Sequence, residues 1–360
     1  MGKFSVNCVR YTAGLASMML YGAACAQSAV TIYGIVDASV QYANKVPTST
    51  GHNAGNAYAL TNGGLGPSLF GIKGHEDLGG SLTTNFDLES GISMANGGYG
   101  TSNGNFWGRR AWVGIGSRYG EIRAGVQASP FFLSIWESDA RGFSSFGSGI
   151  AIYADNVVFT GGVNSTAITY LSPKAAGFEA SVMFAPGGVA GSFQNGQQWS
   201  ASAKYDNGTV MINAAAYHGN GGGASTPVPT TVQFDGRTLG ASYRLNGLTI
   251  KASAVNYNVA GSFNEYVYSA GANYLITPTI SVNAGAWYST DQNHKENHSL
   301  LTGIGVIYLA SVRTSFYAQV AAVSNHGNMN TGLSVTDTSI TKGVHGETTY
   351  GANFGIRHAF

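Results

Sequence analysis

The chain has 360 residues, of which 44% are apolar and only 10% are charged, and its formal net charge is +1. Soluble domains usually carry about 25% charged residues, and a membrane-spanning helix needs roughly 18 consecutive apolar residues, which no stretch supplies. The chain has no run of basic residues, so we expect no nucleic-acid partner. A membrane β-barrel fits this composition, because only every second residue of its strands meets lipid.

The amino terminus has the pattern of an export signal. Lys3 and Arg10 supply positive charge, and the stretch TAGLASMMLYGAACA at 12–26 is apolar and ends in small residues. We therefore predict a signal peptide over residues 1–26 and one outer-membrane barrel domain over residues 27–360.

Both cysteines, Cys8 and Cys25, lie within this predicted signal. The exported chain then has no thiol, so we expect neither a disulfide nor a cysteine metal site. Removing the signal lowers the number of Lys and Arg residues from 18 to 16 against 17 acidic residues, which leaves a net charge of about −1. A lipidated Cys25 is the alternative, although Gly22 stands where such signals usually carry leucine.

The first strand predicted in the exported chain runs from Val30 to Tyr42. Its even positions are apolar or small, while its odd positions include Thr31, Asp37 and Gln41. An alternation of period two places one set on the lipid side of a strand and the other on the water side. The same pattern recurs in the stretches that begin at 82, 265 and 280.

The predicted connections between strands alternate in length. Seven short turns lie at 77–80, 117–120, 172–177, 206–208, 246–247, 277–279 and 310–312. Eight long loops rich in Gly, Asn and Ser lie at 44–66, 92–105, 129–162, 186–197, 218–233, 258–264, 290–297 and 324–343. Fifteen connections join sixteen strands, and an even number with short turns on one side predicts an all-β, antiparallel transmembrane barrel.

The last strand continues its alternation to the final residue. Phe354, Ile356, His358 and Phe360 share one face of the stretch YGANFGIRHAF at 350–360. In lipid every backbone polar group must be paired, so the last strand has to close on the first. We predict that residues 350–360 pair with residues 30–42.

A secreted soluble β protein, such as a surface adhesin, would also show alternating strands and turn glycines. Tyr and Phe near the strand ends, and few charges on the apolar faces, favour the membrane barrel instead.

Two motifs suggest chemistry that we do not expect, and we predict no catalysis, cofactor or metal. GTSNG at 100–104 has the spacing of a hydrolase nucleophile elbow, but it lies in a glycine-rich loop rather than between a strand and a helix. His294 and His298 are four residues apart, yet the stretch DQNHKENHS is typical of an exposed loop.

Several stretches resemble the trimeric general porins of β-proteobacterial outer membranes. They are SAVTIYGIVDASVQYAN at 28–44, FGIKGHEDLGGSLTTNFDLESGI at 70–92, FWGRRAWVGIGSRYGEIRAGVQASP at 106–130, and the terminal GIRHAF. The resemblance covers the chain after its signal. The terminal Phe360 also resembles the signal that the barrel-insertion machinery reads.

The resemblance implies a sixteen-stranded barrel in contact with outer-membrane lipid and lipopolysaccharide. It also implies a homotrimer and passive diffusion of ions and small hydrophilic solutes. In this family the third loop, here 129–162, folds into the lumen, which makes Glu137, Asp139 and Asp155 candidates to face the pore. A channel specific for one substrate remains the alternative.

The chain departs from the family at three positions of the basic wall, where Leu69, Val126 and Val163 stand in place of the usual arginines. We therefore expect a neutral or cation-preferring constriction, with Lys73 and Arg110 as the remaining basic candidates. Arg123 is left out, because its parity differs from that of Val126.

The inward faces of the first strands also carry acidic residues. Asp37, Asp87 and Glu89 are predicted as hydrated lining of the lumen rather than as a specific binding site.

Overall fold

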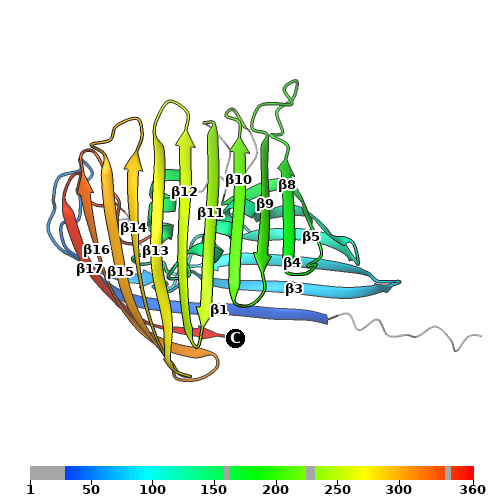
Figure 1. Cartoon of the computed structure of the whole chain (residues 1–360), viewed down its shortest axis with the longest axis horizontal. Helices are drawn as coiled ribbons and strands as arrows, with labels where there is room; N and C mark the ends of the chain where they lie inside the picture. Colours follow the sequence, from blue (N-terminus) through cyan, green and yellow to red (C-terminus); the bar gives the residue numbers. More distant parts are fainter. Residues whose placement is uncertain (1–28, 158–161, 224–231, 337–341) are drawn as a thin grey trace, which may run out of the picture.

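The computed structural model describes residues 29–157, 162–223, 232–336 and 342–360, so the predicted signal peptide lies outside the described residues. The described residues contain seventeen strands and two short helices (Figure 1). The strands are β1 (Ala29–Ala43), β2 (Ala57–Asn62), β3 (Ser68–Gly79), β4 (Leu82–Ile92), β5 (Arg110–Ser117), β6 (Gly120–Ala128), β7 (Val163–Leu171), β8 (Phe178–Ala185), β9 (Gln198–Asp206), β10 (Val210–Gly219), β11 (Phe234–Leu245), β12 (Leu248–Val259), β13 (Asn264–Thr277), β14 (Ile280–Asp291), β15 (His298–Leu309), β16 (Thr314–His326) and β17 (Thr348–Ala359). The helices are α1 (Pro130–Ser138) and α2 (Gly149–Val157).

Sixteen of the strands form a closed antiparallel barrel, which confirms the predicted fold. Each strand from β3 to β16 pairs with the next along the chain, and β1 pairs with both β3 and β17. In Figure 1, β8 to β13 rise along the front wall while β1, β3, β4 and β5 cross behind them, because the strands of a closed barrel are tilted.

The short strand β2 was not predicted and lies within the expected first loop. It pairs with the C-terminal half of β1, where Ala43 faces Ala57. β3 pairs with the N-terminal half of β1, where Ala29 faces His75. The second barrel strand is therefore interrupted between β2 and β3.

The predicted closure between the two ends of the chain is confirmed. Ile35 faces Ala359 and Ala43 faces Gly351, and the backbones of Gly34 and Phe360 exchange two hydrogen bonds with N···O distances of 3.1 and 3.0 Å. A Cβ at Gly34 would lie 2.3 Å from the Phe360 ring, so the terminal ring packs directly on glycine backbone.

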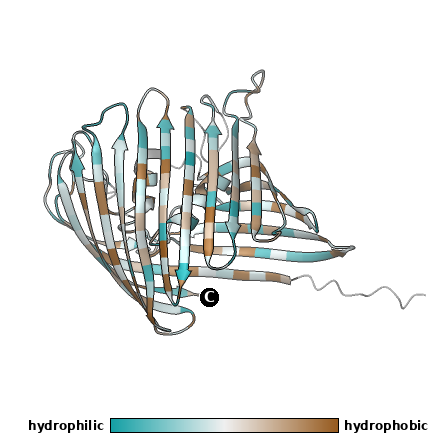
Figure 2. Ribbon diagram, in the orientation of Figure 1, coloured by the Kyte–Doolittle hydropathy of each residue, from teal (hydrophilic) through white to brown (hydrophobic). Residues whose placement is uncertain are grey.

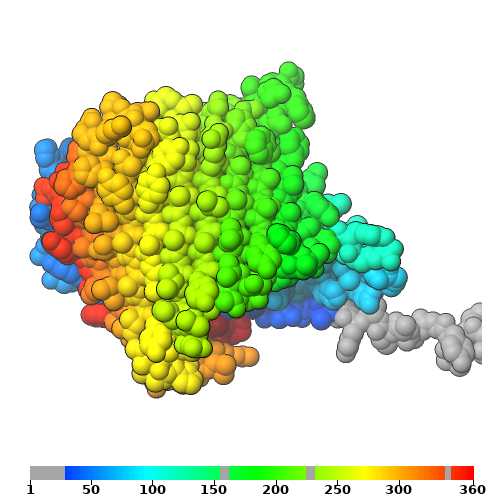
Figure 3. Space-filling view, viewed as in Figure 1, coloured from blue at the N-terminus to red at the C-terminus, as the bar shows by residue number. Residues whose placement is uncertain are grey.

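The two faces of the strands differ in accessibility as the alternation predicts. On β1, Val30 is 66% exposed while Asp37 is fully buried at 0%. Figure 2 shows the resulting mixture of apolar and polar residues along each strand, and Figure 3 shows the front wall as a continuous surface. The exposed face is apolar and the other face is polar, as expected for lipid outside and water inside.

A hydrophobic core lies inside the barrel, where the loop after β6 meets the wall. α1 contacts β9, β10, β11 and β12, and the ring of Phe131 packs against those of Tyr217, Phe234 and Tyr257. Ser129 caps α1 by accepting a bond from the Phe132 N–H at 3.0 Å, and Pro130 begins the helix. Neither described helix is long and apolar enough to span a membrane.

Candidate pore lining and constriction

Residues 129–162, here called loop 3, contain α1 and α2. The described residues of this loop contact the wall on two sides, at β9 to β12 through α1 and at β14 and β16 through Arg141. Beyond α1, Arg141 lies against the opposite part of the wall, with its side chain almost fully buried. Its Nε donates to Asn283 on β14 at 2.7 Å, and its Nη2 donates to Gln319 on β16. Its Nη1 donates to the carbonyls of Phe146 and Gly147 at 2.8 and 2.6 Å. Burial lowers the pKa of Arg141 to about 10, so the guanidinium is charged at neutral pH.

Asp139 was predicted to face the pore, and this prediction is wrong. Its carboxylate is buried inside loop 3, where it accepts bonds from the backbone N–H groups of Arg141, Phe143 and Gly149 at 2.9, 2.9 and 3.1 Å and from the Trp287 indole at 3.1 Å. Burial raises the pKa of the Asp139 carboxyl above its usual value. The residue therefore shapes the loop rather than contacting solutes.

Asp37 was also predicted to line the lumen, and it is buried as well. It accepts bonds from the backbone N–H groups of Gly64 and Gly66, each at 3.2 Å, and from the Tyr317 hydroxyl. These bonds hold the break between β2 and β3 on the lumen side. The Ser144 hydroxyl of loop 3 donates to the Gly64 carbonyl at 3.0 Å, so the break also supports loop 3.

Asp87 and Glu89 lie on the inner wall but are covered by arginines. Arg110 Nη1 lies 3.0 Å from Asp87, Arg109 Nε lies 2.8 Å from Glu89, and the Tyr33 hydroxyl donates to both acids at 2.7 and 3.0 Å. Both carboxylates are buried, whereas 45% of the Arg110 side chain is exposed. Water in this part of the lumen therefore meets the cations, which include the exposed Lys73.

Excluding Arg123 from the lumen was wrong. Arg123 faces Gly114 and lies on the same side as Trp112, with its guanidinium 4.2 Å from the indole centroid. Val126 instead faces Ala111 on the outer side, beside a register shift between Gly125 and Gln127. On β6, Arg123 rather than Val126 therefore lies on the inner side of the wall.

The two other departures from the family lie in different surroundings. Leu69 lies buried on the inner side of β3, opposite Ile35. Val163 begins β7 and faces Ala128.

A second group of charges lies beneath α1 on β9, β11 and β12, and sequence reasoning missed it. Lys204 Nζ lies 2.9 Å from the Glu137 carboxylate. Glu137, which was predicted to face the pore, is therefore paired with a cation of the wall. Arg244 binds Asp206 through two bonds of 2.9 and 3.2 Å. Lys251 donates to the carbonyls of Glu137 and Asp139 at 2.8 and 3.0 Å, at the C-terminal end of α1.

A signal for these cations was present in the sequence. Lys204, Arg244 and Lys251 share the parity of serines on the same strands, namely Ser202, Ser242 and Ser253. The alternation of polar residues along these strands therefore predicts that all three cations lie on the inner wall.

The remaining candidate residues lie away from these clusters. Asp155 is in α2, but its side chain lies outside the described part of the chain. Phe354, Ile356 and Phe360 are exposed on the outer face, and His358 Nδ1 lies 2.9 Å from the Thr314 hydroxyl.

The histidine pair and the GTSNG stretch each make ordinary contacts with their own neighbours. His298 stacks on His326 with ring centroids 4.4 Å apart, whereas His294 Nδ1 lies 3.6 Å from Glu296. In GTSNG, the Ser102 hydroxyl donates to the Asn105 carbonyl at 2.7 Å.

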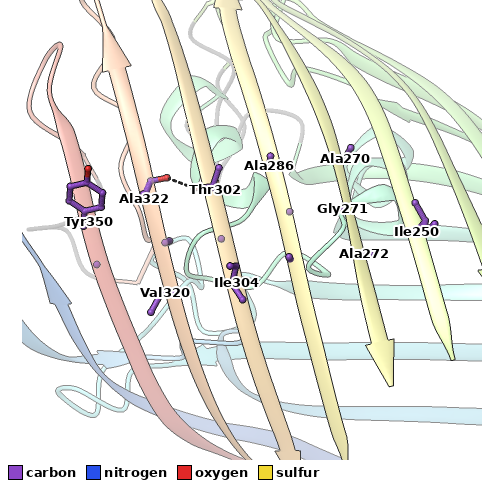
Figure 4. A pocket seen from close by; sticks show the side chains of 15 residues that line it. Ile250, Ala270, Gly271, Ala272, Ala286, Thr302, Ile304, Val320, Ala322 and Tyr350 are labelled. Atoms are coloured by element: carbon purple, nitrogen blue, oxygen red, sulfur yellow. Dashed lines mark hydrogen bonds between the residues drawn. The ribbon is translucent and has the colours of Figure 1, made fainter. Parts of the chain in front are cut away.

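The outer face also carries a shallow hollow of about 910 Å³ over β12 to β17 (Figure 4). Small side chains such as Ala270, Ala286 and Ala322 form its floor, and Ile250 and Tyr350 lie at its sides. Because this hollow faces outward at the middle of the strands, it lies apart from the lumen.

Comparisons with known proteins agree with this architecture. A family described as Gram-negative porin matches residues 13–328. Outer membrane porin protein 32 of Delftia acidovorans is 30% identical, over 96% of this chain and 98% of its own length. The solved anion-selective porin of Comamonas acidovorans is 25% identical and superposes with a TM-score of 0.80, covering 93% of this chain and 100% of that one. OmpT of Vibrio cholerae, solved in a trimer form, is 14% identical with a TM-score of 0.69 over 92% of this chain and 99% of that one.

Proposed function

The chain belongs to the Gram-negative porin family and is an outer-membrane diffusion channel, and from this premise we propose that it conducts small hydrophilic solutes as a homotrimer with a preference for anions. Members of this family are channels, so the chain is not an enzyme. One observation carries the conduction pathway: a closed ring of paired strands with an apolar outer face and a polar inner face.

The preference for anions rests on which charges meet water. Asp87 and Glu89 are buried beneath Arg109 and Arg110, while Arg110 and Lys73 are exposed. Mobile ions respond most strongly to charge at the surface of the bore. The exposed cations therefore favour anions, in contrast to the neutral or cation-preferring constriction expected from the sequence.

The zero-current potential of the protein in a planar bilayer under a KCl gradient tests this proposal. We expect a sign that corresponds to greater permeability for chloride than for potassium. A potential near zero or of opposite sign would refute the anion preference, and the absence of conductance would refute the channel itself.

The trimer and the other partners are part of the same proposal. The exposed apolar face, with residues such as Ile32 and Val320, suits contact with outer-membrane lipid, lipopolysaccharide or neighbouring copies. The trimer form of the OmpT structure supports three copies, and Phe360 suits recognition by the insertion machinery. Native mass spectrometry in detergent should give three times the mass of the exported chain.

A further inference from the structure

One face of α1 leaves apolar side chains uncovered inside the barrel. Trp136 is 49% exposed and Leu133 is 40% exposed, although Phe131 and Ile135 on the same helix are buried. Residues three apart lie on one face of a helix, so the two exposed side chains form one strip. Because α1 packs against the inner wall, this strip faces the lumen rather than lipid.

Trp136 borders a cavity of about 240 Å³ between loop 3 and the wall. Gly142 of loop 3 and Met211 of β10 contribute to its lining. Its charged lining residues are Glu137, Lys204, Asp206, Arg244 and Lys251. An exposed indole therefore adjoins a small polar cavity inside the barrel.

The cavity holds one more positive than negative charge. Lys204 is paired with Glu137 and Arg244 with Asp206. Glu179, 3.3 Å from Lys204, lies outside the lining and also pairs with Lys174 at 3.8 Å. Lys251 donates to two backbone carbonyls and, among the described residues, makes no salt bridge with a carboxylate of the lining.

We propose that this cavity is a transit subsite for small aromatic monocarboxylates, with the ring against Trp136 and the carboxylate toward Lys251 and its neighbouring cations. The proposal rests on the chain being a channel and adds a solute class to it. Aromatic rings gain from contact with an indole, and carboxylates form strong bonds with ammonium and guanidinium groups. The volume lies below the roughly 300 Å³ at which drug-sized pockets begin, which suits a solute with a single ring.

Blocking experiments on single channels in planar bilayers test this subsite. Benzoate, added to a KCl solution, should reduce the current saturably, and acetate or benzyl alcohol at the same concentration should reduce it far less. Trp136→Ala should raise the half-blocking concentration of benzoate roughly three- to tenfold, and Trp136→Phe should raise it less. The matched control is Trp199→Ala, because Trp199 is 43% exposed on the outer face and should not affect the block.

Several results would overturn the inference. Unsaturable or absent block by benzoate, equal block by acetate, equal block by benzyl alcohol, or block unchanged in both Trp136 variants would each do so. Stronger block by glucose than by benzoate would assign the cavity to neutral sugars instead. Normal KCl conductance in these experiments would show that the channel function stands even when the subsite fails, whereas no conductance in any variant would contradict the channel.

Discussion

Replacing Arg141 with alanine should release loop 3 from the far wall while leaving the barrel intact. Arg141 is 7% exposed and joins loop 3 to β14 and β16 through Asn283 and Gln319. It also bonds the carbonyls of Phe146 and Gly147 within the loop. None of these bonds belongs to the strand ladders that close the barrel.

The expected magnitude follows from the two hydrogen bonds that join this buried cation to the wall. Each hydrogen bond to a charged group contributes about 1.5–3 kcal/mol, so the two together contribute about 3–6 kcal/mol to docking. Taking the lower value of about 3 kcal/mol, the ratio of docked to released loop 3 falls about a hundredfold. Arg141→Lys should recover little, because one ammonium cannot reach four acceptors in a planar fork.

Single-channel recording measures this change directly. The Arg141→Ala channel should show a higher mean conductance and more current noise than the unmodified channel, with unchanged heat-modifiable migration on gels. Arg313→Ala is the matched control, since Arg313 is exposed in the turn between β15 and β16. Unchanged conductance and noise in Arg141→Ala would show that loop 3 is held by its aromatic packing alone.

Three further changes test other parts of the structure. Because burial raises the pKa of Asp139, docked loop 3 binds a proton on this carboxyl more tightly than released loop 3 does. Docking should therefore be strongest below pH 3.8 and weaken as the pH rises through the raised pKa, by about 1.4 kcal/mol per unit of pKa shift. Current noise should increase over that pH window, and Asp139→Asn should abolish this pH dependence. Gly34→Leu should place a side chain where the Phe360 ring lies and destabilise the folded barrel by about 1–3 kcal/mol. The yield of folded barrel on gels should fall, and an equal loss in Val36→Leu would contradict this local cause. Arg110→Gln should move the zero-current potential toward cation preference, while Arg118→Gln, in an exposed turn, should leave it unchanged; no shift in the former would mean that Arg110 does not face the conducting path.

The strand pattern was predictable because each strand follows a local rule. Adjacent residues point to opposite sides, and the side facing lipid tolerates few charges, so β1 and β17 and their pairing could be recognised from their own residues. The same rule, applied throughout, would also have placed Lys204 and Arg244 on the inner wall. The short strand β2 escaped because its six residues lie inside a loop rich in glycine and asparagine.

The alternation of residues along a strand predicted which side of the wall a side chain occupies, but not whether that side chain contacts water. Asp37, Asp87 and Glu89 all point inward as predicted, yet each is buried by groups from other strands. Asp37 meets Tyr317, which is 280 residues away in the sequence. An inward carboxylate can thus either contact water in the pore or act as the buried counter-ion of a neighbouring cation. Residues from other strands decide which of these roles it has.

The sequence by itself determined a sixteen-stranded barrel and its closure, because hydrocarbon requires every backbone group to be paired and every second side chain to be apolar. Only the folded chain sets which groups hold loop 3 in place and which charges border the bore. Those outcomes depend on contacts such as Arg141 with Gln319, 178 residues apart, and Asp139 with Trp287, 148 residues apart. Such contacts exist only after the wall has closed around the loop, so no local pattern in the sequence records them.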